Sequence, residues 1–166
     1  FLAGAAYAED EMSQDEMMAK WMELAQPGGH HGHFGKLAGK WNVTGKAWME
    51  PGQPPVESTG TSTFEVLLGG RYLMQEYTSS FMGMPFHGVD HTTFNRETGK
   101  YDSVWIDDMS AKMSTMSGNF EGKTLVMTGT DMMQGMEFAS RAEATQVSDD
   151  EVHWSMSMSM DDGETW

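Results

Sequence analysis

The chain has 166 residues, enough for a single domain with its own hydrophobic core. It contains no cysteine, which excludes a disulfide scaffold, a thiolate zinc site and thiol catalysis. Its 25 acidic residues outnumber its 10 basic residues, giving a formal net charge of −15, so we expect no nucleic-acid binding and no direct binding to anionic membranes.

The first residues are typical of the end of a signal peptide. An apolar start leads to Ala6-Tyr7-Ala8 and then to a run of acids, a pattern that predicts cleavage after Ala8. We therefore expect residues 1–8 to be a signal-peptide remnant or an apolar anchor, and the mature protein to be periplasmic or secreted. An alanine-rich end of a helix or strand is the alternative interpretation.

Residues 9–29 are expected to form an N-terminal helix and a linker. Met18 and Trp21 belong to an apolar side with helical spacing, and acidic residues gather near the start, where the helix dipole favours them. Pro27-Gly28-Gly29 ends this helix, and a short helix or turn over residues 30–38 leads into the following domain.

From Trp41 onward the hydrophobic pattern has a period of two, as half-buried strands require. No predicted strand is followed by a helical pattern, which excludes a parallel α/β sheet. Turn-forming residues separate the strands, which we predict at Trp41–Met49, Glu57–Leu67, Gly70–Ser80, Phe86–Phe94, Tyr101–Asp107, Lys112–Phe120, Thr124–Thr130, Met136–Thr145 and Val152–Met160.

These strands predict an all-β domain over residues 30–166. An antiparallel up-and-down barrel of about nine to ten strands is favoured, because closure removes exposed strand edges. A barrel of this size can enclose one small ligand. A β-sandwich is the alternative architecture.

Several short motifs stand out in this domain, namely Gly39-Lys40-Trp41, Glu57-Ser58-Thr59-Gly60, Leu68-Gly69-Gly70-Arg71-Tyr72-Leu73, Met82-Gly83-Met84-Pro85-Phe86 and Trp105-Ile106-Asp107. In order and spacing they resemble a bacterial family of small proteins known only as a domain of unknown function. That family is similar in turn to the calycin barrels, which include lipocalins, fatty-acid-binding proteins and nitrobindin-like haem proteins. The resemblance implies a calycin-like barrel with a lumen, an absent last strand, and no particular activity.

Methionine is unusually frequent, with 18 residues. Its flexible side chain fills irregular apolar space, and its thioether is a soft ligand for monovalent copper. We predict an exported binding protein that holds a small apolar or amphipathic molecule in a barrel lumen. The predicted lining residues are Trp41, Met74, Trp105, Met116, Met156 and Met158.

His30, His31 and His33 form the densest group of potential metal ligands. A second hypothesis is therefore the binding of copper or another transition metal by these histidines together with methionines. A solvated, glycine-flanked loop is the alternative interpretation. His87 and His91 would lie about 13 Å apart along one strand, too far to share a metal, but either could face the lumen as a ligand for haem or an anion.

Arg71, Glu76, Asp107 and Arg141 are charges within predicted strands. An inward pair of such residues could orient a ligand, but Arg71 and Glu76 have opposite parity and should point to different faces. Asp107 precedes a second aspartate at a turn and is interpreted as a strand-end cap. The sequence contains no recognisable nucleophile motif or phosphate-binding glycine loop, so no catalytic activity is predicted.

A third hypothesis is that the protein is an accessory subunit of a larger extracytoplasmic assembly. The apolar N-terminus, the number of methionines and the absent last strand motivate it. A protein partner could supply that strand by adding to a free sheet edge.

Overall fold

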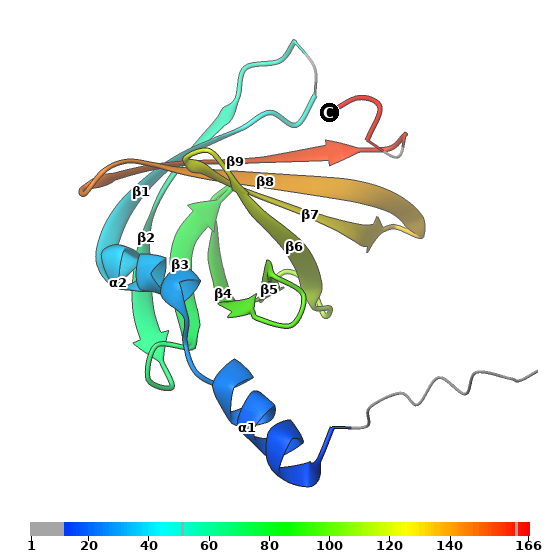
Figure 1. The fold of residues 1–166 in the computed structure, drawn as a ribbon. Coiled ribbons are helices and arrows are strands. Elements are labelled where there is room, and N and C mark those ends of the chain that lie inside the picture. The colour runs from blue at the N-terminus through cyan, green and yellow to red at the C-terminus, as the bar shows by residue number, and fades with distance from the viewer. Residues whose placement is uncertain (1–11, 51, 162) are drawn as a thin grey trace, which may run out of the picture.

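The computed structural model describes residues 12–50, 52–161 and 163–166, so the predicted signal-peptide segment lies outside the described residues. A helix α1 (Gln14–Leu24), a 3-10 turn η1 (Gly29–His33) and a short helix α2 (Phe34–Leu37) come first (Figure 1). The strands that follow are β1 (Gly39–Ala47), β2 (Val56–Leu67), β3 (Tyr72–Phe81), β4 (Met84–Asn95), β5 (Lys100–Asp107), β6 (Ser114–Glu121), β7 (Thr124–Met133), β8 (Met136–Ser148) and β9 (Glu151–Ser159).

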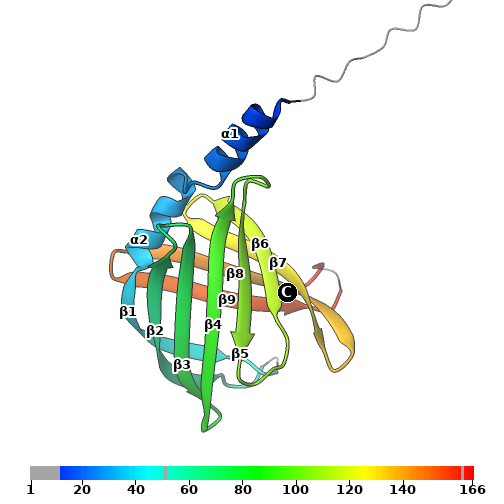
Figure 2. The same ribbon diagram turned by 90° about the horizontal axis from the view of Figure 1, so that it is seen from below.

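These nine strands form one sheet in which each strand pairs antiparallel with its neighbours in sequence. The sheet curls, so that β8 and β9 cross behind β1 to β4 at a steep angle (Figure 2). Within the described residues, β1 pairs only with β2 and β9 only with β8. The predicted all-β antiparallel meander with an N-terminal helix is confirmed, and the described strands form a curled half-barrel that does not close into a ring.

Glycines on the inner face of the sheet allow this curvature. A Cβ atom at Gly118 would lie 1.9 Å from the carbonyl oxygen of Val126, and one at Gly129 would lie 2.3 Å from that of Thr115. Glycine inside a strand often marks such a close approach of a neighbouring backbone. The curled sheet therefore depends on having no side chain at these positions.

A cluster of apolar side chains fills one end of the half-barrel, which we call the closed end. Phe34 of α2 packs there with Leu73 of β3, Phe94 of β4, Tyr101 of β5 and Met127 of β7. Strands from both sides of the curl thus meet in one cluster. The side chains of the helix and of the sheet, rather than hydrogen bonds between β1 and β9, hold the two sides together.

Helix α1 lies outside this half-barrel, and none of its residues is buried. Ser13 caps its start, with its side chain accepting from the Glu16 amide while the Glu16 carboxylate accepts from Ser13. Its last turn has no basic residue of its own. The apolar side that was predicted from the sequence is present, but it is exposed to solvent.

Two arginines from the β2–β3 and β4–β5 turns contact the end of α1. Arg71 donates to the Ala25 carbonyl at 2.6 Å, and Arg96 donates to the carbonyls of Glu23 and Gln26. Cations are favoured at this end of a helix because the last carbonyl groups carry a partial negative charge. No helix in the described part of the chain has the length and apolar character needed to span a membrane.

Replacing Gly118 with alanine tests the close approach on the inner face. The new methyl group would meet backbone atoms of β7, so we expect the free energy of unfolding to fall by about 2 to 3 kcal/mol in urea titrations. Gly35→Ala is the control, because a Cβ there meets nothing within 4 Å and alanine favours the helical conformation. Equal stability of Gly118→Ala and wild type would contradict this account of the curvature.

Candidate binding site

The strand register sorts the side chains onto two faces. The face that packs on Phe34 is the inner, concave one, since it includes the core residues Leu73, Phe94, Tyr101 and Met127. The core cluster occupies its closed end. The other half, which we call the open half, lies toward the β1–β2, β3–β4, β5–β6 and β7–β8 connections.

Three aromatic residues lie on the inner face in the open half. The ring centroids of Tyr77 and Phe86 are 5.9 Å apart, and those of Phe86 and Trp105 are 6.3 Å apart with nearly parallel planes. Gly88 makes room for the indole, because a Cβ atom there would lie 2.1 Å from the Trp105 ring. The Trp105 ring is thereby held against β4, beside the aromatic ring of Phe86.

Asp90 is the cross-strand neighbour of Trp105 on this face, and Gln75 of β3 lies opposite on its other side. The Thr92 hydroxyl donates to the Asp90 carboxylate at 2.6 Å, and Ser103 also contributes a side-chain hydrogen bond. Burial raises the pKa of Asp90 to about 6, although the Thr92 hydroxyl, the charge of His91 on the outer face and the Ser103 hydroxyl act to lower it. No salt bridge of Asp90 is present among the described residues.

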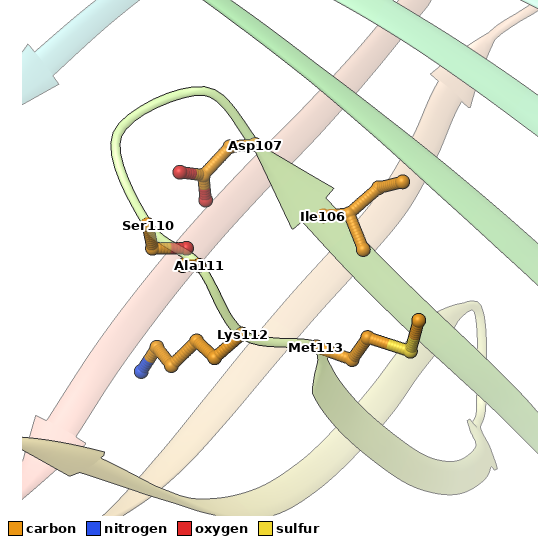
Figure 3. Close-up of a pocket in the computed structure, with 6 residues that line it drawn as sticks. All are labelled: Ile106, Asp107, Ser110, Ala111, Lys112 and Met113. Carbon is orange, nitrogen blue, oxygen red and sulfur yellow. The ribbon is translucent and has the colours of Figure 1, made fainter.

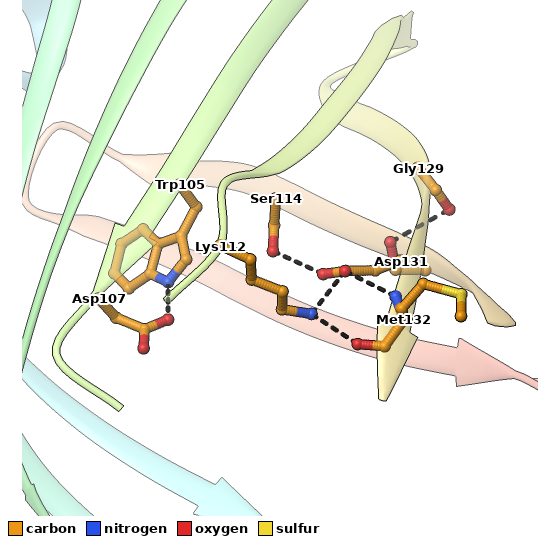
Figure 4. A network of polar contacts seen from close by, with 8 residues as sticks. Trp105, Asp107, Lys112, Ser114, Gly129, Asp131 and Met132 are labelled. Atoms are coloured by element: carbon orange, nitrogen blue, oxygen red, sulfur yellow. Dashed lines mark hydrogen bonds and ion pairs between the residues drawn. The ribbon is translucent and has the colours of Figure 1, made fainter. Parts of the chain in front are cut away.

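The other acids of the inner face are Asp107 and Asp131, and both are engaged within the protein (Figure 4). Asp107 accepts from the Trp105 indole at 2.8 Å and from a backbone amide. Asp131 pairs with Lys112 at 2.5 Å and accepts from Ser114. Burial acts to raise the pKa of Asp131, but the hydrogen bonds and charge of Lys112, with Ser114 and a backbone amide, lower it.

Two shallow hollows lie near the open half, and both are open to solvent. The first, of about 330 Å³, is formed by the connection that follows β5 and is lined by Asp107, Lys112 and Met113 among others (Figure 3). The second, of about 450 Å³, is lined by residues of β7 and β8 together with Gly163 and Trp166. The residues that line these two hollows do not include Phe86, Asp90 or Trp105.

The register brings most of the predicted lining residues to the inner face. Cross-strand pairing places Trp41, Trp105, Met116, Met156 and Met158 there, although Met156 and Met158 remain exposed on the edge strand β9. The prediction for Met74 is wrong. Leu73 and Gln75 point inward and Met74 pairs with His91 on the outer face, because consecutive strand residues alternate between faces.

The three predicted metal-binding histidines lie beneath the closed end, each against a different set of rings. His30 stacks on Phe94 at 4.1 Å, and the ring centroids of His33 and Phe120 are 4.8 Å apart. His31 is buried, its Nδ1 accepts from the Gly28 amide, and burial lowers its pKa. The described residues contain no group of three or more His, Cys, Asp or Glu placed to hold a metal ion.

The remaining charged candidates serve structural contacts. His87 and His91 are on the outer face, where His87 contacts Glu76 at 3.1 Å, so neither faces the interior. Arg141 is also on the outer face and pairs with Glu143. Sequence reasoning missed Asp90, although its position four residues after Phe86 and four before Phe94 gave it the parity of two aromatic residues.

Comparison with known proteins adds one finding to this geometry. A family model described as "Protein of unknown function (DUF1579)" matches residues 26–166. The chain belongs to the DUF1579 family. No curated protein matches it significantly. The DUF1579 match covers η1, α2 and all of the strands, so it includes the closed end and the whole inner face, and it confirms the resemblance to a family of unknown function.

Because the pKa of Asp90 is raised, Asp90→Asn should be more stable than wild type by an amount that depends on pH. The raised pKa means that the folded state binds a proton more tightly than the unfolded state, so wild type loses stability as pH rises from about 4 to above 6. The variant avoids this loss. We expect its advantage over wild type to be about 2 to 3 kcal/mol larger at pH 7.5 than at pH 4 in urea titrations.

Asp131→Asn provides the opposite case. The pKa of Asp131 is lowered in the folded protein, so its ionised form contributes stability that is present at neutral pH and is lost as the pH falls toward 3. This variant should therefore be less stable than wild type at pH 7.5, and the difference in unfolding free energy should shrink in acid.

For Asp90→Asn, a difference from wild type in unfolding free energy that does not change with pH would contradict the buried environment of the Asp90 carboxyl group.

Proposed function

We propose that this DUF1579 protein binds a small apolar or amphipathic molecule on the inner face of a calycin-like half-barrel. The observation that carries the proposal is the division of that face into two parts. The closed end is filled by the core cluster around Tyr101, which is 1% exposed. The open half presents aromatic rings next to hydrogen-bonding side chains, and its buried apolar residue Phe138 lies outside the core cluster.

The chemistry of the open half suits a ligand with an apolar body and a polar group. Phe86 and Trp105 offer the faces of large aromatic rings. Asp90 and Gln75 lie on neighbouring strands of the same face, and Gln75 donates to the hydroxyl of the buried Ser62 at 2.7 Å. Ligand sites are commonly apolar concavities with a few placed polar groups that fix orientation.

Flexible side chains around the open half would allow ligands of several shapes. Exposed methionines flank the connections that border it, and methionine adapts its shape at low cost. They are Met82, Met84, Met109, Met113, Met132, Met133 and Met136. Such a rim would let a molecule enter without a rigid gate. The proposal places the protein outside the cytoplasm, on the basis of the signal-like residues 1–8.

The proposal is tested with N-phenyl-1-naphthylamine, an uncharged probe whose fluorescence rises in apolar sites. We expect saturable binding near one probe per chain, and about tenfold weaker binding in Trp105→Ala because a large ring surface is lost. Trp21→Ala is the matched control, since Trp21 is an exposed residue of α1, which lies outside the half-barrel. Absence of saturable binding, or equal weakening by both variants, would contradict the proposal.

A second candidate function is that of a subunit in a larger assembly. The free edges of β1 and β9 within the described residues favour it, because unpaired strand edges accept further strands. If it holds, native mass spectrometry of protein isolated from its source should show a defined complex with another chain. A chain that is monomeric under those conditions would contradict it.

A further inference from the structure

The inner face has a consistent sign of charge. Its strand positions include the carboxylates Asp90, Asp107 and Asp131, and the register places the lysines, arginines and histidines of the described strands on the outer face. Lys112, in the connection after β5, approaches this face but is committed to Asp131. A negatively charged ligand group would therefore meet no free cation on the described strands of this face.

The three inner carboxylates differ in what they contact. Asp107 and Asp131 each accept hydrogen bonds from groups of the connection after β5 or of β7, and Asp131 also has a salt bridge. Asp90 has only hydroxyl donors. Removing an ion from water without a salt-bridge partner is costly, and buried ionisable groups of this kind are candidates for functional sites.

The aromatic side chains near Asp90 indicate which chemical class of ligand group would bind there. Its cross-strand neighbour Trp105 leans over Gly88 toward Phe86, so two aromatic rings lie on one side of Asp90 along the inner face. On the other side the Asp90 carboxylate accepts from Thr92 and has a side-chain hydrogen bond with Ser103. Tyr77 extends this aromatic set on β3. Aromatic faces attract cations through their electron-rich rings, and cages of such rings recognise alkylated ammonium groups.

We infer that the molecule bound in the open half carries a positive charge, an alkylammonium or quaternary ammonium group, which Asp90 neutralises and Trp105 and Phe86 face. This inference rests on the proposed function and specifies its ligand class. The apolar part of such a molecule would lie along the inner face toward Met116 and the core cluster. At pH 7.5 Asp90 is mainly ionised, since its pKa of about 6 lies below that pH.

The test uses three ten-carbon amphiphiles below their micelle concentrations at pH 7.5. They are decyltrimethylammonium, decyl maltoside and decyl sulfate, and each is titrated to displace N-phenyl-1-naphthylamine from the wild-type protein. We expect the cation to bind about tenfold more tightly than the neutral compound, and the anion to bind most weakly. The same ranking should hold at raised salt, because the contact is local.

Two variants separate a local contact from attraction to an acidic protein. Asp90→Asn should reduce affinity for the cation about tenfold and leave the neutral compound unchanged. Asp102→Asn removes the same charge from the outer face, where Asp102 accepts from Asn95 and Ser117, and it should retain the wild-type ranking. Urea titration of each variant reports whether it is folded.

The outcomes distinguish this inference from the function on which it rests. Equal binding of all three amphiphiles by wild type would overturn the cationic ligand and leave the proposed binding function in place. Equal loss for all three in Asp90→Asn would make Asp90 a structural residue and would also overturn the inference. If neither the neutral probe nor any amphiphile binds, the proposed function fails together with it.

Discussion

The contact between Phe34 and the inner face of the sheet is the constraint on which the rest of the structure depends. In the described chain no hydrogen bonds join β1 to β9, so side chains must hold the curled sheet in shape. Phe34 is 3% exposed and meets residues of β3, β4, β5 and β7 in one cluster. The Tyr101 hydroxyl also donates to the His30 carbonyl at 2.8 Å, which ties η1 to the same point.

This arrangement separates stability from binding along one face. The closed end provides the buried apolar contacts, and its histidines act as additional rings in the aromatic cluster. The open half can therefore keep polar and charged groups that would be unfavourable in a core. Asp131 forms a salt bridge with Lys112, whereas Asp90 has no salt bridge among the described residues.

Much of the fold could be predicted from the sequence because strand alternation is a local property. The strand boundaries that we predicted from period two and turn residues lie within three residues of those in the structure, and β7 starts at Thr124 as predicted. The face of each strand was harder to predict. In β3 apolar residues occupy both parities, since Tyr72 and Met74 point outward and Leu73 inward, so the pattern alone could not place Met74.

The site depends on contacts that join residues far apart in the sequence. His30 to His33 suggest a metal site when only their spacing is considered, but in the structure each ring packs on aromatic residues between 60 and 90 positions away or on Phe34 nearby. Nothing in the sequence around Asp90 identified it as a site residue. Its significance comes from the Trp105 ring on the next strand and from the absence of a cation on that face of the described strands, neither of which one strand can reveal.

A ligand of this class would change the stability of the whole domain. The carboxylate of Asp90 reduces stability in the free protein at neutral pH, because burial favours its protonated form. A bound cation would remove that cost and add its own contacts with the aromatic rings. Since only the folded chain brings Asp90, Trp105 and Phe86 together, binding would stabilise the fold in proportion to the logarithm of ligand concentration. Asp90, whose burial lowers the stability of the free protein at neutral pH, would thus also couple that stability to ligand binding.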